Sequence, residues 1–97
     1  MIKNIGINEF KKIMNNSDVL ILDTRDFNEY KEKRVLKAIN IDIDNIDSIL
    51  KICPDKNKKI LVYCTKGARS IVVAERLDKL GYTQIYNLQG GIQKILK

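Results

Sequence analysis

The stretch ILVYCTKGARSIVVAERLDKLG, residues 60–81, carries the strongest structural signals in this sequence of 97 residues. It opens with the hydrophobic run Ile60–Tyr63, which is typical of a strand that is buried on both faces. After a glycine-containing turn, a helix is predicted from apolar residues that recur at helical spacing, namely Val73, Ala74, Leu77 and Leu80. Gly81 is the expected C-terminal stop of this helix. A buried strand that leads by a tight loop into a helix indicates an α/β fold.

The rest of the chain alternates in the same way. Further strands are predicted at Ile2–Ile5, Val19–Leu22, Ala38–Ile41 and Ile85–Leu88. Three further helices are predicted between these strands. The first has apolar positions at Ile7, Phe10, Ile13 and Met14, and the second begins with a capping box at Asp26 and Glu29. The third has an apolar face at Ile46, Ile49, Leu50 and Cys53 and ends before Pro54. A turn at Gly90 and Gly91 is expected to lead into a short final helix, Ile92–Leu96.

Strands that alternate with helices imply right-handed crossovers and a parallel sheet. No linker, repeat or low-complexity segment interrupts the pattern. We therefore expect one three-layer α/β domain over residues 1–97, with a mostly parallel central sheet of about five strands and helices on both faces.

The composition restricts the chemistry that is possible here. Hydrophobic residues make up 44% of the chain and charged residues 31%, a balance typical of globular proteins. The chain contains no histidine, which excludes a Ser-His-Asp triad, a Cys-His dyad and every His-ligated metal site within it. Its 2 cysteines, Cys53 and Cys64, are too few for a four-ligand zinc site, so no metal site is expected.

The net charge of +6 comes from 18 basic and 12 acidic residues. A nucleic-acid binder would combine a basic stripe with aromatic side chains, but the lysines are scattered and aromatics make up 6%. No nucleic-acid partner is predicted, and a small anionic substrate is favoured because positive charge raises its local concentration. No apolar run has the length of a signal peptide or membrane span, so we expect a cytoplasmic protein with free thiols and no membrane partner.

In a parallel sheet the functional site is expected beyond the carboxyl ends of the strands. This rule brings three segments together at one edge, namely Asp23–Arg25, Cys64–Ser70 and Gln89–Gly91. Cys64 is the nucleophile among them, provided that it is a thiolate. Its activation is expected from the backbone amides of residues 65–70, from the N-terminus of the following helix, and from the charges of Lys66 and Arg69. Gly67 supplies the backbone freedom that such a loop needs.

The segment Cys64–Ser70 resembles the active-site loop of the rhodanese family of sulfurtransferases, whose pattern is Cys-x-x-Gly-x-Arg-Ser. Other segments resemble further family motifs in the expected order, namely Asp23–Arg25, Glu29–Tyr30, Ala38–Ile41, Leu80–Tyr82 and Leu88–Ile92. The chain departs from the family at residues 33–38, where it reads KRVLKA in place of Gly-His-Ile-x-Gly-Ala. It also carries Asp42 and Ile95 where the family usually has proline and tryptophan.

The resemblance implies a mechanism and a set of site residues. Cys64 is expected to take sulfur from thiosulfate or a persulfide donor, to become a persulfide itself, and to pass the sulfur to cyanide, a thiol or a protein. No metal or organic cofactor is needed for this chemistry. Asp23 and Arg25 are interpreted as supporting residues, with Glu29 as the expected ion-pair partner of Arg25. The residues expected to bind the anionic substrate are Thr65, Lys66, Gly67, Ala68, Arg69 and Ser70.

Other functions remain open at this point. One alternative is a phosphatase or arsenate reductase of the same fold, whose active-site loop is similar. In those enzymes, however, the loop between cysteine and arginine is one residue longer than the loop between Cys64 and Arg69. A non-enzymatic binding module is another alternative, although such modules commonly lose the cysteine that this chain keeps. A further one is a carrier that passes its persulfide to a single protein partner. Cys53, on an apolar helix face, is interpreted as a core residue.

Overall fold

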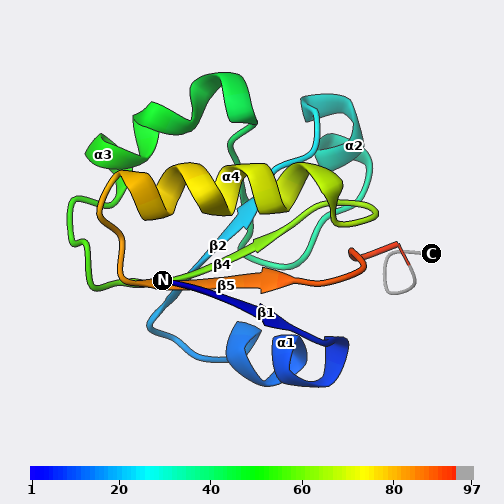
Figure 1. Ribbon diagram of the computed structural model, residues 1–97. Coiled ribbons are helices and arrows are strands. Elements are labelled where there is room, and N and C mark those ends of the chain that lie inside the picture. The colour runs from blue at the N-terminus through cyan, green and yellow to red at the C-terminus, as the bar shows by residue number, and fades with distance from the viewer. Residues whose placement is uncertain (94–97) are drawn as a thin grey trace.

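The central sheet draws its strands from the whole length of the chain. The computed structural model describes residues 1–93, and Figure 1 shows the sheet between layers of helices. The strands are β1 (Ile2–Ile5), β2 (Val19–Asp23), β3 (Ile39–Asn40), β4 (Lys59–Tyr63) and β5 (Gln84–Leu88). All neighbouring strands are parallel, and the order across the 5-stranded sheet is β1-β5-β4-β2-β3. The predicted α/β class with a parallel sheet is confirmed.

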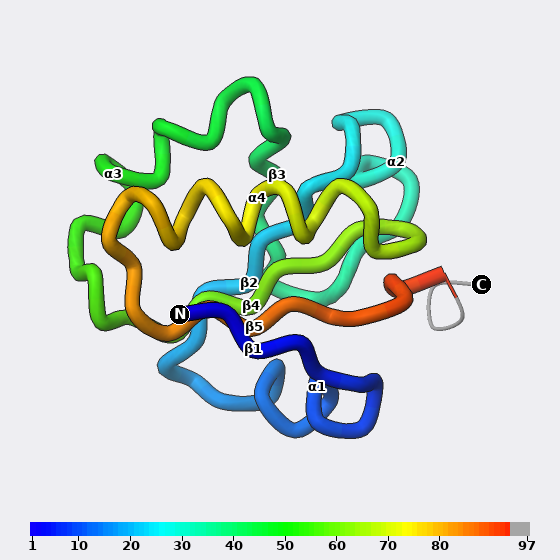
Figure 2. The backbone as a smooth tube through the Cα atoms, in the orientation of Figure 1, coloured from blue at the N-terminus to red at the C-terminus, as the bar shows by residue number. Residues whose placement is uncertain are grey.

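Helices cover both faces of this sheet (Figures 1 and 2). The helical segments are α1 (Ile7–Met14), α2 (Phe27–Glu32), the 3-10 helix η1 (Ile43–Ser48), α3 (Ile49–Ile52) and α4 (Ala68–Lys79). α1 lies against one face, while α3 and α4 lie on the other. α2 begins with the predicted capping box, in which Asp26 and Glu29 each accept a hydrogen bond from the other's backbone amide. Within residues 1–93, no helix combines the length and the apolar character needed to span a membrane.

The alternation of side chains along β4 divides the interior into two cores. Ile60 and Val62 belong to the core beneath α4, η1 and α3. Leu61 and Tyr63 belong to the core on the opposite face, where Phe10 of α1 packs edge-on against the Tyr63 ring. All of these β4 side chains are fully buried, as expected for the middle strand of a sheet covered on both faces. The residue that follows β4 is therefore held by a rigid element.

The helix predicted with an apolar face at residues 46–53 is wrong in detail. The chain forms the 3-10 helix η1 first and then the short helix α3, which is capped at Cys53. A 3-10 helix has about three residues per turn, so Ile46 and Ile49 lie on one side of it, and both are buried. Leu50 then points outward and is 40% exposed, so it does not belong to the apolar face.

Two other elements differ in extent from their predictions. The strand predicted at Ala38–Ile41 is reduced to β3, because Ala38 instead closes a turn by donating its amide to the Val35 carbonyl. The helix predicted at Ile92–Leu96 is not formed at residues 92–93, which make a bend and a turn. The remainder of that predicted helix lies outside the described residues.

The carboxyl ends of β2, β4 and β5 meet at one edge of the sheet, as the sequence predicts. The amide and the hydroxyl of Thr24, after β2, both donate to the Tyr63 carbonyl at the end of β4. The amide of Ile92, after β5, donates to the Cys64 carbonyl at 2.9 Å. These hydrogen bonds join the three segments that the sequence places at the site.

Candidate active site

Cys64 lies where β4 ends and the loop toward α4 begins. The residue is buried, with 1% of its surface exposed. Gly67 makes the turn into the helix with a φ of 101°, a left-handed conformation that glycine adopts at little cost. α4 begins at Ala68, so the unpaired amides of its first turn face back toward the loop.

The sulfur of Cys64 is surrounded by hydrogen-bond donors. The Gly67 amide donates to Sγ at 3.0 Å, and the Ser70 amide donates at 3.3 Å. The Ser70 hydroxyl lies 3.5 Å from Sγ, where it accepts from the thiol and can donate to a thiolate once its hydrogen turns. Ser70 is itself fully buried, and so its hydroxyl is held in this position. Backbone amides that converge in this way form an anion-binding nest.

These contacts decide the protonation of Cys64. Burial alone raises the pKa of the thiol, because a buried thiolate loses its hydration. The Ser70 hydroxyl and three loop amides outweigh burial, so the pKa of Cys64 lies below its ordinary value. A lower pKa increases the share of nucleophilic thiolate at neutral pH. The largest lowering contributions are hydrogen bonds. The predicted charge of Arg69 also acts on Cys64, because the Cys64 thiolate in turn raises the pKa of Arg69.

A second turn, which follows β5, packs directly against this loop. A Cβ atom at Gly91 would lie 2.1 Å from the Thr65 carbonyl oxygen, so only glycine fits there without displacing the loop. Gly91 also has a φ of 83°, which favours glycine. The next residue, Ile92, donates its amide to the Cys64 carbonyl. The turn therefore fixes the backbone on which the reactive sulfur is carried.

Glu29 of α2 reaches the same loop from another direction. Its carboxylate accepts hydrogen bonds from the Arg69 guanidinium at 2.7 and 3.3 Å, and from the Thr65 hydroxyl at 3.0 Å. The hydrogen bonds from Arg69 are the main reason that the pKa of Glu29 falls to about 2, and Glu29 in turn raises the pKa of Arg69. Both groups are ionised at neutral pH, and they tie α2 to the first turn of α4.

An open pocket of about 330 Å³ lies against the sulfur. Its lining residues are Glu29, Cys64, Thr65, Lys66, Ala68 and Arg69. Four of the predicted substrate-binding residues therefore face this pocket, while the other two, Gly67 and Ser70, donate to the sulfur. Lys66 is exposed, so its ammonium group is accessible to an arriving anion.

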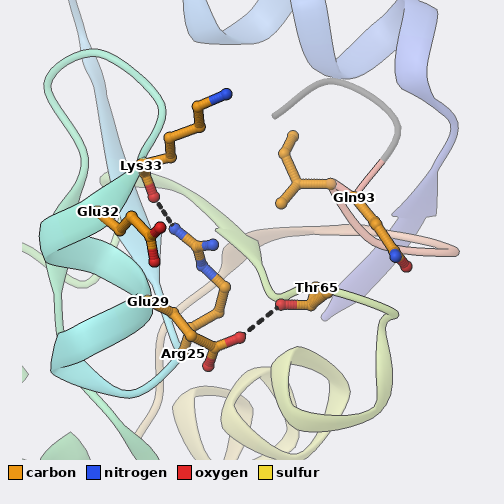
Figure 3. Close-up of a pocket in the computed structure, with 7 residues that line it drawn as sticks. Arg25, Glu29, Glu32, Lys33, Thr65 and Gln93 are labelled. Atoms are coloured by element: carbon orange, nitrogen blue, oxygen red, sulfur yellow. Dashed lines mark hydrogen bonds between the residues drawn. The ribbon is translucent and has the colours of Figure 1, made fainter. Parts of the chain in front are cut away.

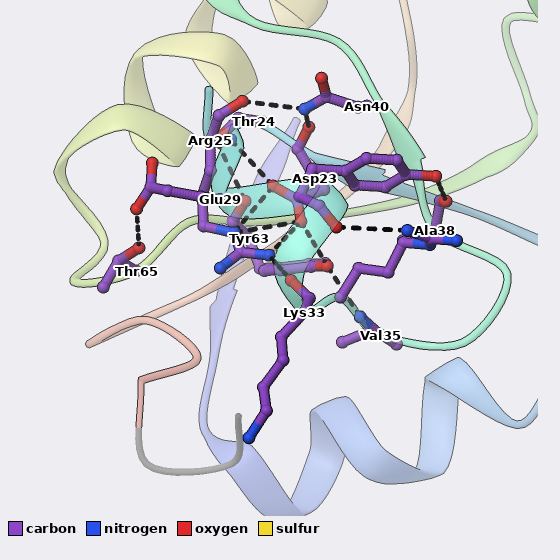
Figure 4. Close-up of polar contacts among 12 residues, drawn as sticks. Asp23, Thr24, Arg25, Glu29, Lys33, Val35, Ala38, Asn40, Tyr63 and Thr65 are labelled. Carbon is purple, nitrogen blue, oxygen red and sulfur yellow. Dashed lines mark hydrogen bonds and ion pairs between the residues drawn. The ribbon is translucent and has the colours of Figure 1, made fainter. Parts of the chain in front are cut away.

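Asp23 and Arg25 form a buried ion pair after the end of β2 (Figure 4). The guanidinium of Arg25 donates to Asp23 Oδ2 at 2.7 Å, and the Arg25 amide donates to Oδ1 at 2.9 Å. Burial lowers the pKa of Arg25, but the hydrogen bond to Asp23 and the negative charge of Asp23, with smaller contributions from Tyr63 and Glu29, together outweigh burial, so the net pKa is raised. The prediction that Arg25 pairs with Glu29 is wrong, because Asp23 is its neighbour on the same strand end and Arg69 engages Glu29.

The ion pair is the centre of a larger polar network. The Tyr63 hydroxyl donates to Asp23 Oδ2 at 2.7 Å and accepts from the Val35 amide at 3.0 Å. Arg25 also donates to the Lys33 carbonyl, as Figure 4 shows. Burial is the main reason that the pKa of Tyr63 is raised, so the phenol stays protonated and keeps donating. The network holds the ends of β2 and β4 and the loop after α2 in a fixed arrangement.

A second pocket, of about 380 Å³, adjoins the first. Its lining residues, most of them labelled in Figure 3, are Arg25, Glu29, Glu32, Lys33, Thr65, Ile92 and Gln93. Glu29 and Thr65 line both pockets, and the hydrogen bond between them, dashed in Figure 3, lies at the boundary. A molecule that reaches Cys64 from this side passes Glu29.

Two of these residues, Glu29 and Gly91, make contacts at the site that the sequence does not predict. The sequence assigns Gly91 a backbone turn, which is confirmed. It assigns Glu29 a helix cap, which is confirmed, and an ion pair with Arg25, which is wrong. It misses the contact of Glu29 with Arg69, 40 positions along the chain, and the contact of Gly91 with Thr65. Local spacing carries no information on such contacts, although both residues lie in segments that resemble family motifs.

Comparison with known proteins gives one consistent family. The family described as Rhodanese-like domain matches residues 7–97. The thiosulfate sulfurtransferase GlpE of Coxiella burnetii is 31% identical over 93 residues, which cover 96% of this chain and 86% of that protein. A tRNA uridine(34) hydroxylase of Cytophaga hutchinsonii is 33% identical over 96 residues, but the match spans 95% of this chain and only 31% of that protein. The crystal structure of a rhodanese-related protein from Thermoplasma volcanium has a TM-score of 0.80 at 29% identity, covering 95% of this chain and 88% of that one.

Proposed function

This chain belongs to the rhodanese-like domain family, and on that premise we propose that it transfers sulfane sulfur through a persulfide on Cys64. The observation that supports this most is the set of donors around the sulfur, with the amides of Gly67 and Ser70 at 3.0 and 3.3 Å from Sγ. These donors favour the thiolate, and they suit a persulfide anion in the same place. The donor that we propose is thiosulfate or a persulfide.

In the first half-reaction, the Cys64 thiolate attacks the outer sulfur of the donor. With thiosulfate, the S–S bond breaks and sulfite leaves with the bonding electron pair, so Cys64 becomes a persulfide anion. With a persulfide R–S–SH, the thiolate R–S⁻ leaves in the same way. Lys66, exposed at the pocket, attracts the incoming anion.

In the second half-reaction, an acceptor attacks the terminal sulfur and Cys64 leaves as a thiolate. The lowered pKa of Cys64 helps this step, because a thiol of lower pKa is a better leaving group. Cyanide would yield thiocyanate, and a thiol would yield a new persulfide. Because donor and acceptor react in turn with one covalent intermediate, ping-pong kinetics are expected. The scheme uses no metal and no organic cofactor.

A persulfide carrier for one protein acceptor is the second candidate. The observation that favours it is the pocket of about 380 Å³ that adjoins the Cys64 pocket through Glu29 and Thr65, because a larger partner can contact both pockets at once. A carrier would accept sulfur readily and release it slowly to cyanide. A phosphatase is disfavoured, because Arg69 is held by Glu29 and the loop is one residue shorter than in such enzymes. We propose the cytoplasm as the compartment, since reducing conditions keep both thiols available.

The mass of the intact protein after incubation with thiosulfate tests the proposal. We expect a gain of one sulfur atom that cyanide removes with release of thiocyanate, and no gain in Cys64→Ser. An unchanged mass with both thiosulfate and a persulfide donor would contradict sulfur transfer. Hydrolysis of aryl phosphates at a rate comparable to sulfur transfer would instead favour the phosphatase alternative.

A further inference from the structure

The pocket over Cys64 contains a carboxylate that the sulfur chemistry does not require. Of the side chains that line it, Lys66 and Arg69 are cationic and Glu29 is anionic. Once Cys64 is a thiolate, the two cations are balanced by the thiolate and by Glu29. An incoming dianion therefore meets a pocket with no net charge, although the protein as a whole carries +6.

The position of Glu29 makes this balance specific. Its two carboxylate oxygens both contact Arg69, at 2.7 and 3.3 Å, so the guanidinium is directed to Glu29. The side chains of this pair are 33% and 44% exposed, which leaves their charges accessible to a bound anion. Charges within a pocket of this size lie inside the screening length of about 10 Å at 0.1 M salt, so they act on a donor at the sulfur.

Resting on the proposed function, we propose that Glu29 sets the donor selectivity of the site. By neutralising Arg69 it favours sulfur donors with a single negative charge, such as persulfide or thiosulfonate anions, over the thiosulfate dianion. Glu29 acts through Arg69 and through its own charge, and it takes no part in making or breaking the S–S bond. It is a positioning and selectivity residue.

Two donors with the same reacting atoms separate charge from chemistry. Thiosulfate carries two negative charges and releases sulfite. Methanethiosulfonate, CH3–SO2–S⁻, carries one negative charge and releases methanesulfinate. In both cases the Cys64 thiolate attacks the outer sulfur, the S–S bond breaks, and the leaving group departs with the electron pair. A difference between the two donors therefore reports mainly on charge.

The variant Glu29→Gln removes the charge and keeps the shape. Glutamine keeps one carbonyl oxygen, which takes the place of Oε1 and accepts from the Asp26 amide, so the capping box survives. Its amide nitrogen takes the place of Oε2 and donates to the Thr65 hydroxyl, which can also accept. We expect the KM for thiosulfate to fall on the order of fivefold at low salt, with a steeper salt dependence, because a unit charge nearby acts twice as strongly on a dianion. The KM for methanethiosulfonate should fall only about twofold, which is roughly the square root of the change for the dianion, and kcat should change little for either donor.

The matched control is Glu9→Gln on α1, which makes the same change in net charge at an exposed position away from the pocket. This control should leave the ratio of the two KM values unchanged. The proposal is overturned if Glu29→Gln shifts both donors equally or neither, or if Glu9→Gln shifts the ratio as much. If the unmodified protein takes sulfur from neither of these donors and from no persulfide donor, the proposed function itself fails. If it takes sulfur but the ratio stays constant, only the role of Glu29 fails.

Discussion

The two cysteines of this chain are both buried and both free of disulfides, yet their surroundings have opposite effects. Cys53 ends α3, and its thiol donates to the Asp55 carbonyl at 3.6 Å. Burial, helped by the Asp55 carboxylate, raises the pKa of Cys53. Cys64 precedes α4, where amides donate to its sulfur and lower its pKa despite burial. Burial therefore does not decide reactivity here; the hydrogen-bond donors at the start of a helix do.

The largest difference between the two cysteines is expected when each thiol is removed in turn. Cys64→Ser should lower sulfur transfer by at least about a thousandfold, since the covalent nucleophile is lost. Cys53→Ser should keep the transfer rate and lose only some stability, because it places a hydroxyl in an apolar core. Steady-state transfer from thiosulfate to cyanide, with melting curves for both variants, measures this. Loss of transfer in a folded Cys53→Ser protein would contradict the assignment.

Next in size is a change that deforms the loop while leaving both thiols in place. Gly91→Ala would put a Cβ atom 2.1 Å from the Thr65 carbonyl oxygen, so the Cys64 loop must move. We expect a loss of transfer on the order of a hundredfold, together with clear destabilisation.

Gly90→Ala is the matched control for this change. Gly90 has a φ of 85°, close to the 83° of Gly91, so both variants strain the backbone by about 1 kcal/mol. A Cβ atom at Gly90 meets nothing within 4 Å, so transfer should be nearly retained. Equal activity loss in the two variants would show that backbone strain, and not the contact with the loop, is what matters.

The opposite pKa directions of the two cysteines predict different pH profiles. The rate of Cys64 alkylation should rise with pH through a midpoint below about 8.5, the value for a free thiol, because the thiolate forms earlier. Ser70→Ala removes the hydroxyl that donates to the thiolate, so the midpoint should move upward. Cys53 in the folded protein should react slowly and with a higher midpoint. A Cys64 midpoint at or above that of a free thiol would contradict the claim that the surrounding hydrogen-bond donors lower the pKa of Cys64.

The smallest effect is expected from removing the charge of Lys66, which attracts the donor but makes no hydrogen bond to the Cys64 sulfur within the described residues. Lys66→Gln should raise the KM for thiosulfate about two- to threefold and flatten its salt dependence, while the alkylation midpoint of Cys64 stays nearly constant. The melting temperature should barely change, because exposed charges contribute little to folding. Lys11→Gln, exposed on α1, is the control. A KM that is unchanged at every salt concentration would make Lys66 a bystander.

Local patterns in the sequence predict the elements that local physics controls. The hydrophobic run of β4, the capping box at Asp26 and the stop at Gly81 all appear in the structure as predicted. The segment around Leu50 is less predictable, because helical and 3-10 spacing share their first two positions.

Contacts between segments that are distant in the chain are the features that the sequence predicts least well. The choice of Glu29 as partner of Arg69, 40 positions along the chain, depends on how α2 is placed relative to the start of α4. The close approach of Gly91 to Thr65 likewise depends on the order of β4 and β5 in the sheet. Such choices follow from the tertiary structure and leave no periodic signal in the chain.

The most direct test of the central claim is to locate the transferred sulfur among the two cysteines. The protein is incubated with thiosulfate at neutral pH and digested without reductant. The masses of the peptides that carry Cys53 and Cys64 are then measured separately by mass spectrometry. The predicted result is one extra sulfur atom on the Cys64 peptide, lost on treatment with cyanide or a reducing thiol, and none on the Cys53 peptide. Sulfur on the Cys53 peptide, or on neither peptide after incubation with thiosulfate and, separately, with a persulfide donor, would contradict the assignment of Cys64 as the residue that carries the sulfur.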